Sequence, residues 1–202
     1  MTDLGTESRR PGRPRRVEVD TSILEAASEL FTELGYDALC VEGVAARAGV
    51  SKATIYRRYP SKAALVIAAA AALGRSAKGP ILDTGSLRGD LRGLGVGYRR
   101  LLESEAGRAI PALIVARHRD PELAEAHRSF IAERRAEAVV VVARGVERGE
   151  IRADTDADIE LVVDLVAGPL FYRVLITGDT PDGDYVDRLV DVVLRAFAPD
   201  PG

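Results

Sequence analysis

The side chains with the clearest chemical potential lie between residues 46 and 62, where every charged residue is basic. Lysine and arginine donate hydrogen bonds to phosphates and to the major-groove edge of guanine, and threonine and tyrosine hydroxyls can serve the same surface. The basic residues are Arg47, Lys52, Arg57, Arg58 and Lys62. With no acid among them, the segment could present a face of one charge sign to a nucleic-acid backbone.

Two short helices joined by a tight turn would position these side chains. Residues 41–48 place apolar side chains at the i, i+3, i+4 and i+7 spacing of one helix face. Gly49 follows, where the turn needs a residue that adopts positive φ without steric cost, and Ser51 can cap the second helix. The outward face of that second helix carries Lys52, Ala53, Thr54, Tyr56, Arg57 and Tyr59. The pattern predicts a helix-turn-helix that binds the DNA major groove.

The segment from about residue 23 to residue 65 resembles the DNA-binding domain of the TetR family of bacterial transcriptional regulators. The matching residues are Ala26, Ala27, Leu30, Phe31, Gly35, Tyr36, Val44, Ala45, Ala48, Gly49, Val50, Ser51, Thr54, Ile55, Tyr56, Tyr59, Ser61, Lys62 and Leu65. Cys40 departs from the pattern, since a threonine usually caps the second helix there, and Arg58 replaces a frequent aromatic residue or histidine. Beyond residue 65 only the helical layout is similar.

A basic arm precedes this segment. Residues 1–18 hold almost no apolar side chains, so they are expected to form a disordered arm. The run Arg-Pro-Gly-Arg-Pro-Arg-Arg at 10–16 could enter an A·T-rich minor groove or simply attract phosphates. Together with the helix-turn-helix, the arm gives the predicted DNA-binding set. Its members are Arg13, Arg15, Arg16, Cys40, Val41, Ser51, Lys52, Ala53, Thr54, Tyr56, Arg57, Tyr59 and Lys62, the last placed against a phosphate by the resemblance.

The composition is that of a globular chain. The 202 residues are 47% hydrophobic and 29% charged. The net charge of −3 conceals a basic N-terminal part and a mildly acidic remainder, so only the first part is expected to meet nucleic acid. One cysteine fits a reducing compartment. Because no apolar run approaches the ~20 residues of a membrane span, we expect a soluble, cytoplasmic protein with no membrane partner.

The periodicity predicts an all-α protein of about nine helices. Residues 19–62 would form a three-helix DNA-binding domain, and residues 63–202 a helical bundle for ligand binding and dimerisation. The segment 62–78 has high helix propensity and would link the two. Between residues 86 and 104 a helix carries Gly89, Gly93, Gly95 and Gly97, which favours close helix packing or a mobile wall over a nucleotide-binding loop.

The last two helices are the expected subunit interface. Residues 159–177 are apolar nearly all round, so one side would belong to a second subunit of a homodimer. The expected interface residues are Leu165, Phe171, Val174, Val186, Leu189, Val190 and Val193. The expected lining of a pocket for an amphipathic small-molecule effector, which could equally be ordinary core, is Tyr98, Leu102, Leu113, Arg117, Phe130, Phe171 and Tyr172.

Residues for catalysis or metal binding are not evident. His118 and His127 lie nine apart, which does not align two ligands on one helix face, and no cofactor motif is present. Cys40 could be a redox switch or an ordinary capping residue. The resemblance to the TetR family, together with the predicted helix-turn-helix, implies a ligand-responsive repressor that binds a palindromic operator as a homodimer. An architectural DNA-binding protein without an effector, or a helical enzyme or carrier, are the alternatives.

Overall fold

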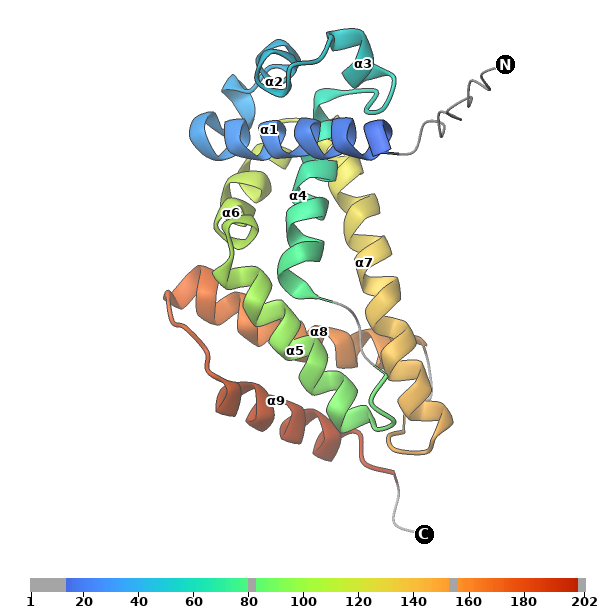
Figure 1. Ribbon diagram of the computed structural model, residues 1–202. Coiled ribbons are helices and arrows are strands. Elements are labelled where there is room, and N and C mark those ends of the chain that lie inside the picture. The colour runs from blue at the N-terminus through green and yellow to red at the C-terminus, as the bar shows by residue number, and fades with distance from the viewer. Residues whose placement is uncertain (1–13, 80–82, 153–155, 200–202) are drawn as a thin grey trace, which may run out of the picture.

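The computed structural model describes residues 14–79, 83–152 and 156–199, and within these it contains nine α-helices and no strand. The first four are α1 (Pro14–Ala38), α2 (Val41–Ala48), α3 (Lys52–Tyr56) and α4 (Lys62–Lys78). The rest are α5 (Leu87–Glu103), α6 (Glu105–Arg117), α7 (Pro121–Glu147), α8 (Asp156–Tyr172), its π-helical extension η1 (Arg173–Thr177), and α9 (Gly183–Ala196). The all-α prediction is confirmed. Figure 1 shows α2 and α3 at one end of the molecule and α9 at the other.

The first helix begins earlier than expected. The predicted disordered arm extended to residue 18, but α1 starts at Pro14, so Arg15 and Arg16 are helical rather than extended. Proline fits the first turn of a helix because its φ is already suitable and no hydrogen bond to its nitrogen is needed there. Arg13 lies outside the described residues. At the other end Gly35 adopts φ 76°, which interrupts the helix where the sequence indicated.

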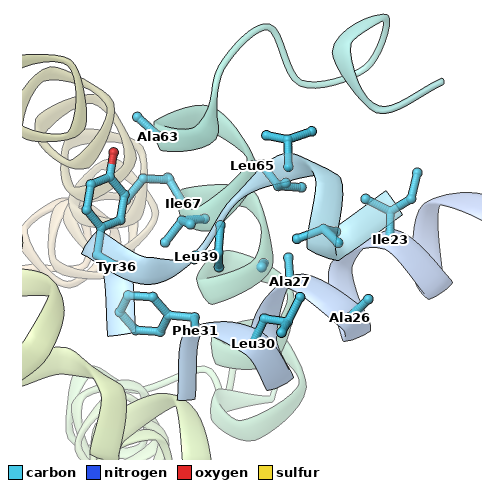
Figure 2. Packing of buried hydrophobic residues seen from close by; sticks show 14 of the residues in the cluster. Ile23, Ala26, Ala27, Leu30, Phe31, Tyr36, Leu39, Ala63, Leu65 and Ile67 are labelled. Carbon is cyan, nitrogen blue, oxygen red and sulfur yellow. The ribbon is translucent and has the colours of Figure 1, made fainter. Parts of the chain in front are cut away.

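The N-terminal helices share one compact core (Figure 2). Helices α1, α2, α3 and α4 all contribute side chains that are almost completely buried. They include Ile23, Ala27, Val44, Ile55 and Leu65, and Leu39 of the link between α1 and α2 is buried with them. The same core continues into the body, because Leu113 of α6 and Leu123 of α7 belong to it. Helix α1 accordingly lies across the upper ends of α4, α6 and α7 (Figure 1).

The remaining helices pack around a second core, and glycines permit their close approach. A Cβ on Gly95 of α5 would lie 2.7 Å from Val186 Cγ1 of α9. A Cβ on Gly145 of α7 would lie 2.7 Å from Leu87 Cδ2 of α5. These distances are shorter than any carbon–carbon contact permits. The sequence left two interpretations of the α5 glycines, close helix packing or a mobile wall. At Gly95 the structure shows close packing.

Candidate DNA-binding surface and effector cavity

The turn between α2 and α3 has the geometry that the sequence predicted. Gly49 ends α2 in the left-handed conformation, with φ 67° and ψ 31°. The Val50 amide donates to the Ala45 carbonyl at 3.0 Å, which satisfies a carbonyl that the helix end leaves free. Ser51 Oγ accepts from the Thr54 amide at 3.2 Å and caps α3. The turn is thus held by a backbone bond at the end of α2 and by a side-chain cap at the start of α3.

The outer face of α3 is open while its inner face is buried. Ile55 is fully buried, whereas the predicted contact residues Ser51, Lys52, Ala53, Tyr56 and Arg57 are exposed and Thr54 and Tyr59 are partly so. Cys40 is exposed at the start of α2 and its side chain makes no capping bond. Val41 corrects the prediction: it is only 3% exposed and cannot reach DNA. As the first residue of the apolar face of α2, it points into the core.

Carboxylates from outside the basic segment neutralise much of it. Arg47 donates two hydrogen bonds to Glu33, at 2.7 and 2.8 Å, and this lowers the pKa of Glu33. Lys52 pairs with Glu42. Arg58 pairs with Asp20 of α1 and donates to the Thr54 carbonyl at 3.2 Å.

Arg58, which departs from the family pattern, therefore fastens α3 to α1. Asp20 is its partner inside α1 and does not cap that helix. Within the described chain, Arg57 and Lys62 are the basic residues of this run that have no ion-pair partner, and Lys62 instead contacts Tyr36 and the Asp37 carbonyl. Three of the five basic residues are thus paired in three dimensions, and Arg57 is the arginine that has no carboxylate partner.

Lys62 and Tyr36 join the DNA-binding end to the body. The Lys62 ammonium lies 4.3 Å from the centre of the Tyr36 ring and donates to the Asp37 carbonyl at 3.2 Å. Tyr36 Oη donates to Asp120 Oδ2 at 2.6 Å, and Asp120 also caps α7. Burial and this carboxylate raise the pKa of Tyr36. These contacts connect the start of α7 to Lys62 at the start of α4.

A cavity of about 220 Å³ lies within the body, bounded by α1, α4, α5, α6, α7 and α8. Of the seven residues expected to line a pocket, five do so. They are Tyr98, Leu113, Arg117, Phe130 and Phe171. The other two were wrong: Leu102 is buried in a separate cluster with Leu170 and Val186, and Tyr172 is 58% exposed. Successive helix residues point about 100° apart, so Phe171 and Tyr172 cannot both face the cavity.

Polar groups occupy the wall of this otherwise apolar cavity. Arg117 donates to His127 Nδ1 at 3.1 Å, and burial together with that cation lowers the pKa of His127. Lys78, at the end of α4, lies with its ammonium 4.4 Å from the centre of the Tyr98 ring. Burial, and secondarily Arg134, lower the pKa of Lys78 to about 8. Sequence reasoning missed Lys78 because a charged residue at a helix end normally faces solvent. It missed His127 and Arg134 because periodicity inside α7 does not show which polar residues face a cavity.

The expected subunit interface needs correction. Val186, Val190 and Val193 are buried inside the single chain, where they pack on α5 and α8 and are unavailable to a partner. Leu165, Val174 and Leu189 are partly exposed, and Phe171 lines the cavity. The large apolar residues that do reach the surface of the last helices were not among the expected interface residues, and Tyr172 was expected in the pocket instead. They are Leu161, Tyr172 and Ile176 on α8 and η1, and Val192 on α9.

The fold and the helix-turn-helix define a DNA-binding transcriptional regulator, and comparison with known proteins names its family. Residues 23–69 match "Bacterial regulatory proteins, tetR family", and residues 81–193 match "Tetracyclin repressor-like, C-terminal domain". The chain belongs to the TetR family of transcriptional regulators, which are not enzymes.

Two relatives and one solved structure show the extent of the similarity. The HTH-type transcriptional regulator YdeS of Bacillus subtilis is 40% identical over 92% of this chain and 91% of its own. The DNA-binding transcriptional repressor TetR of Mycobacteroides abscessus is 35% identical over 86% and 90%. The crystal structure of the TetR family regulator SCO0332 superposes with a TM-score of 0.71 at 34% identity, covering 90% of this chain and all of that one.

None of the described helices has the length and apolar character needed to cross a membrane. In the same part of the chain, no three histidine, cysteine, aspartate or glutamate side chains gather as metal ligands would.

Proposed function

We propose that this protein is a ligand-responsive repressor that binds a palindromic operator as a homodimer and releases it when a small molecule enters the cavity. The observation that carries the proposal is the boundary of the cavity. Phe31 of α1 and four residues of α4 line it, so a ligand would touch the DNA-binding end directly. That the Mycobacteroides abscessus relative is described as a repressor supports the direction of regulation.

DNA recognition is assigned to the exposed face of α3. Thr54 and Tyr56 would contact base edges or fix the helix beside them, while Lys52 and Arg57 supply charge or read guanine. Cys40, Ser51, Ala53, Tyr59 and Lys62 complete the surface on the protein side. Two copies of α3 in one dimer would meet half-sites about one helical turn apart or somewhat more, with one turn being roughly 34–36 Å.

Effector control would work through Phe31 and α4. Phe31 belongs to the core that holds the DNA-binding helices and also lines the cavity. A ligand that binds better when these side chains are displaced favours the displaced arrangement of α1 and α4. In a dimer, that arrangement changes the distance between the two α3 helices and so weakens binding to a fixed pair of half-sites.

Dimerisation is assigned to the outer face of α8, η1 and α9. Leu161, Tyr172, Ile176 and Val192 are all more than 45% exposed, and the partly exposed Leu165 and Leu189 lie on the same helices. Contact between this face and its symmetry copy would bury them in a four-helix interface. The proposed interface therefore contains these exposed residues in place of the buried valines of α9 that the sequence had suggested.

The test begins with DNA selected from random fragments by the purified protein. Competition binding with the selected and a random duplex, at one fixed salt concentration, gives the ratio of the two affinities. Thr54→Ala and Tyr56→Ala should reduce this ratio, since a good base contact is worth about 1–3 kcal/mol of discrimination.

Arg108→Ala, an exposed arginine on α6, is the matched control and should leave the ratio unchanged. If both α3 variants keep the ratio of the unmodified protein, α3 is not the recognition helix. A compound screen for release of the selected DNA then tests the effector. Failure of every compound that occupies the cavity to release DNA would favour an architectural protein without an effector.

A further inference from the structure

A buried lysine is the most unusual feature of the cavity. Lys78 is only 6% exposed although it ends α4. Gly97 of α5 allows this placement, because a Cβ there would lie 2.9 Å from Lys78 Cγ and 3.1 Å from the Lys78 carbonyl oxygen. The chain has only three lysines among its 28 basic residues, and the other two lie at the DNA-binding end.

The Lys78 ammonium has no hydrogen-bond acceptor among the described residues. Its neighbour on one side is the face of Tyr98, whose ring attracts a cation but accepts only weakly. Burying an ammonium with three unused donors is unfavourable unless a partner compensates it. An acceptor delivered from outside would supply that compensation, and Lys78 belongs to the lining of the cavity.

The other charged groups around the cavity do not provide that acceptor. The described residues that line it include no aspartate or glutamate. Glu137 attracts the Lys78 ammonium, but it forms an ion pair with Arg134 at 3.1 Å, and Arg134 opposes it. Arg117 donates a hydrogen bond to the buried His127. The cavity is therefore apolar, and of the three cations in its lining Arg134 pairs with Glu137, Arg117 bonds to a neutral imidazole, and Lys78 has no acceptor among the described residues.

We propose that the effector is the anion of a small lipophilic carboxylic acid, whose carboxylate accepts hydrogen bonds from Lys78 Nζ. This deepens the proposed function and rests on it, since it names the ligand class of the same cavity. The apolar body of the acid would lie among Leu113, Ile114 and Phe171. Among the described cations of the lining, Lys78 is the one with no hydrogen-bond acceptor, and one carboxylate supplies that acceptor with a matching single charge. The volume of about 220 Å³ is below the roughly 300–1,000 Å³ of typical ligand pockets, which favours a short acid.

The test compares matched probes that differ only at the head group. Hexanoate, octanoate, 3-phenylpropionate and 5-phenylpentanoate are each titrated calorimetrically beside the corresponding primary amide and primary amine. The unmodified protein should bind at least one carboxylate about tenfold or more tighter than its amide, as expected for a hydrogen bond to a charged group, and its amine more weakly still.

Lys78→Met should remove this preference while keeping the apolar wall. Arg75→Met, which removes an exposed cation from the same helix, should retain it. The proposal is overturned if no carboxylate is preferred over its amide, if none of the twelve probes binds, or if Arg117→Met abolishes the preference and Lys78→Met does not.

A second measurement needs no substitution in the cavity. With lysine labelled at the Cε carbon, the protein should give three lysine signals by NMR, assigned with Lys52→Arg and Lys62→Arg. The Lys78 signal should titrate near the pKa of about 8 in the free protein and well above it with the preferred carboxylate bound. An unchanged Lys78 titration would contradict contact with the anion.

Release of the selected DNA separates the two proposals. If the carboxylates bind in a Lys78-dependent way but leave DNA bound, the anion site stands and the effector role fails. If neutral or cationic probes release DNA as well as the acids do, the effector role stands and the anion site fails.

Discussion

The two ends of this molecule treat buried and semi-buried charge in opposite ways. At the DNA-binding end, Arg47 and Arg58 are each paired with a carboxylate of α1, and the helices around them share a closely packed core. In the body, Lys78 faces a cavity with no acceptor of its own. The DNA-binding end thus pairs Arg47 and Arg58 within the chain, while the body leaves the Lys78 ammonium without an acceptor among the described residues. Buried and semi-buried charge is therefore compensated at one end of the molecule and left open at the other.

The largest effect is expected where a second subunit would cover the body. Leu161→Asp combined with Tyr172→Asp should convert dimers to monomers and abolish operator binding, because burying unpaired carboxylates costs several kcal/mol. Sedimentation measures the assembly state. Val115→Asp, at an equally exposed apolar residue of α6, should leave the dimer intact. A stable dimer of the double variant would remove α8 from the interface.

The next largest effect is expected from removing a buried side chain in the core of the DNA-binding end. Ile55→Ala removes a fully buried side chain and should lower the free energy of unfolding by about 2–5 kcal/mol, with loss of operator affinity. Urea denaturation followed by circular dichroism gives the value. Val115→Ala, at an exposed site on α6 outside the proposed subunit interface, should stay within about 0.5 kcal/mol. Equal losses at the two sites would mean that the core around α3 is less tightly packed than the structure shows.

In the body, removing a charge should stabilise the protein. Lys78→Met should raise the free energy of unfolding near neutral pH by about 1–3 kcal/mol, since each unit of pKa shift corresponds to ~1.4 kcal/mol. The pKa of Lys78 is about 8 in the folded chain against an ordinary 10.5.

The pH dependence of this gain follows from the two pKa values. Below pH 8 both states hold the proton and the penalty is complete. Between 8 and 10.5 only the unfolded chain holds it, so the unmodified protein gains stability as pH rises and the advantage of Lys78→Met shrinks. Urea titrations of both proteins across this range measure the difference, with Lys62→Met as control. A difference independent of pH would show that Lys78 is not desolvated.

The smallest effects distinguish the two neighbouring arginines that follow α3. Arg57→Ala should weaken binding to all DNA sequences and flatten the slope of log K against log salt by about 0.9, with stability unchanged. Arg58→Ala should leave that slope alone and cost about 1 kcal/mol of stability, because it releases α3 from Asp20. Identical behaviour of the two variants would mean that the Arg58–Asp20 pair does not set their roles.

The helix-turn-helix could be read from the sequence because its determinants are local. Gly49, Ser51 and the apolar spacing of 41–48 act over fewer than ten residues, and each was found in the expected conformation. The order and approximate length of the helices followed for the same reason, since periodicity and caps act within one helix. The exception was the start of α1, where a proline that suggested an extended arm instead occupies a first helical turn.

Only the tertiary structure decided which apolar faces meet each other and which charges are paired. Val186 and Tyr172 both lie on apolar helices, yet one is buried against α5 and the other is open to solvent. From the sequence, Lys78 is expected to be a solvent-exposed residue at a helix end. In the structure it is buried, because α5 packs against it at Gly97. Periodicity establishes that a face is apolar, but its partner depends on how distant helices pack, and the burial of a charge depends on all of them together.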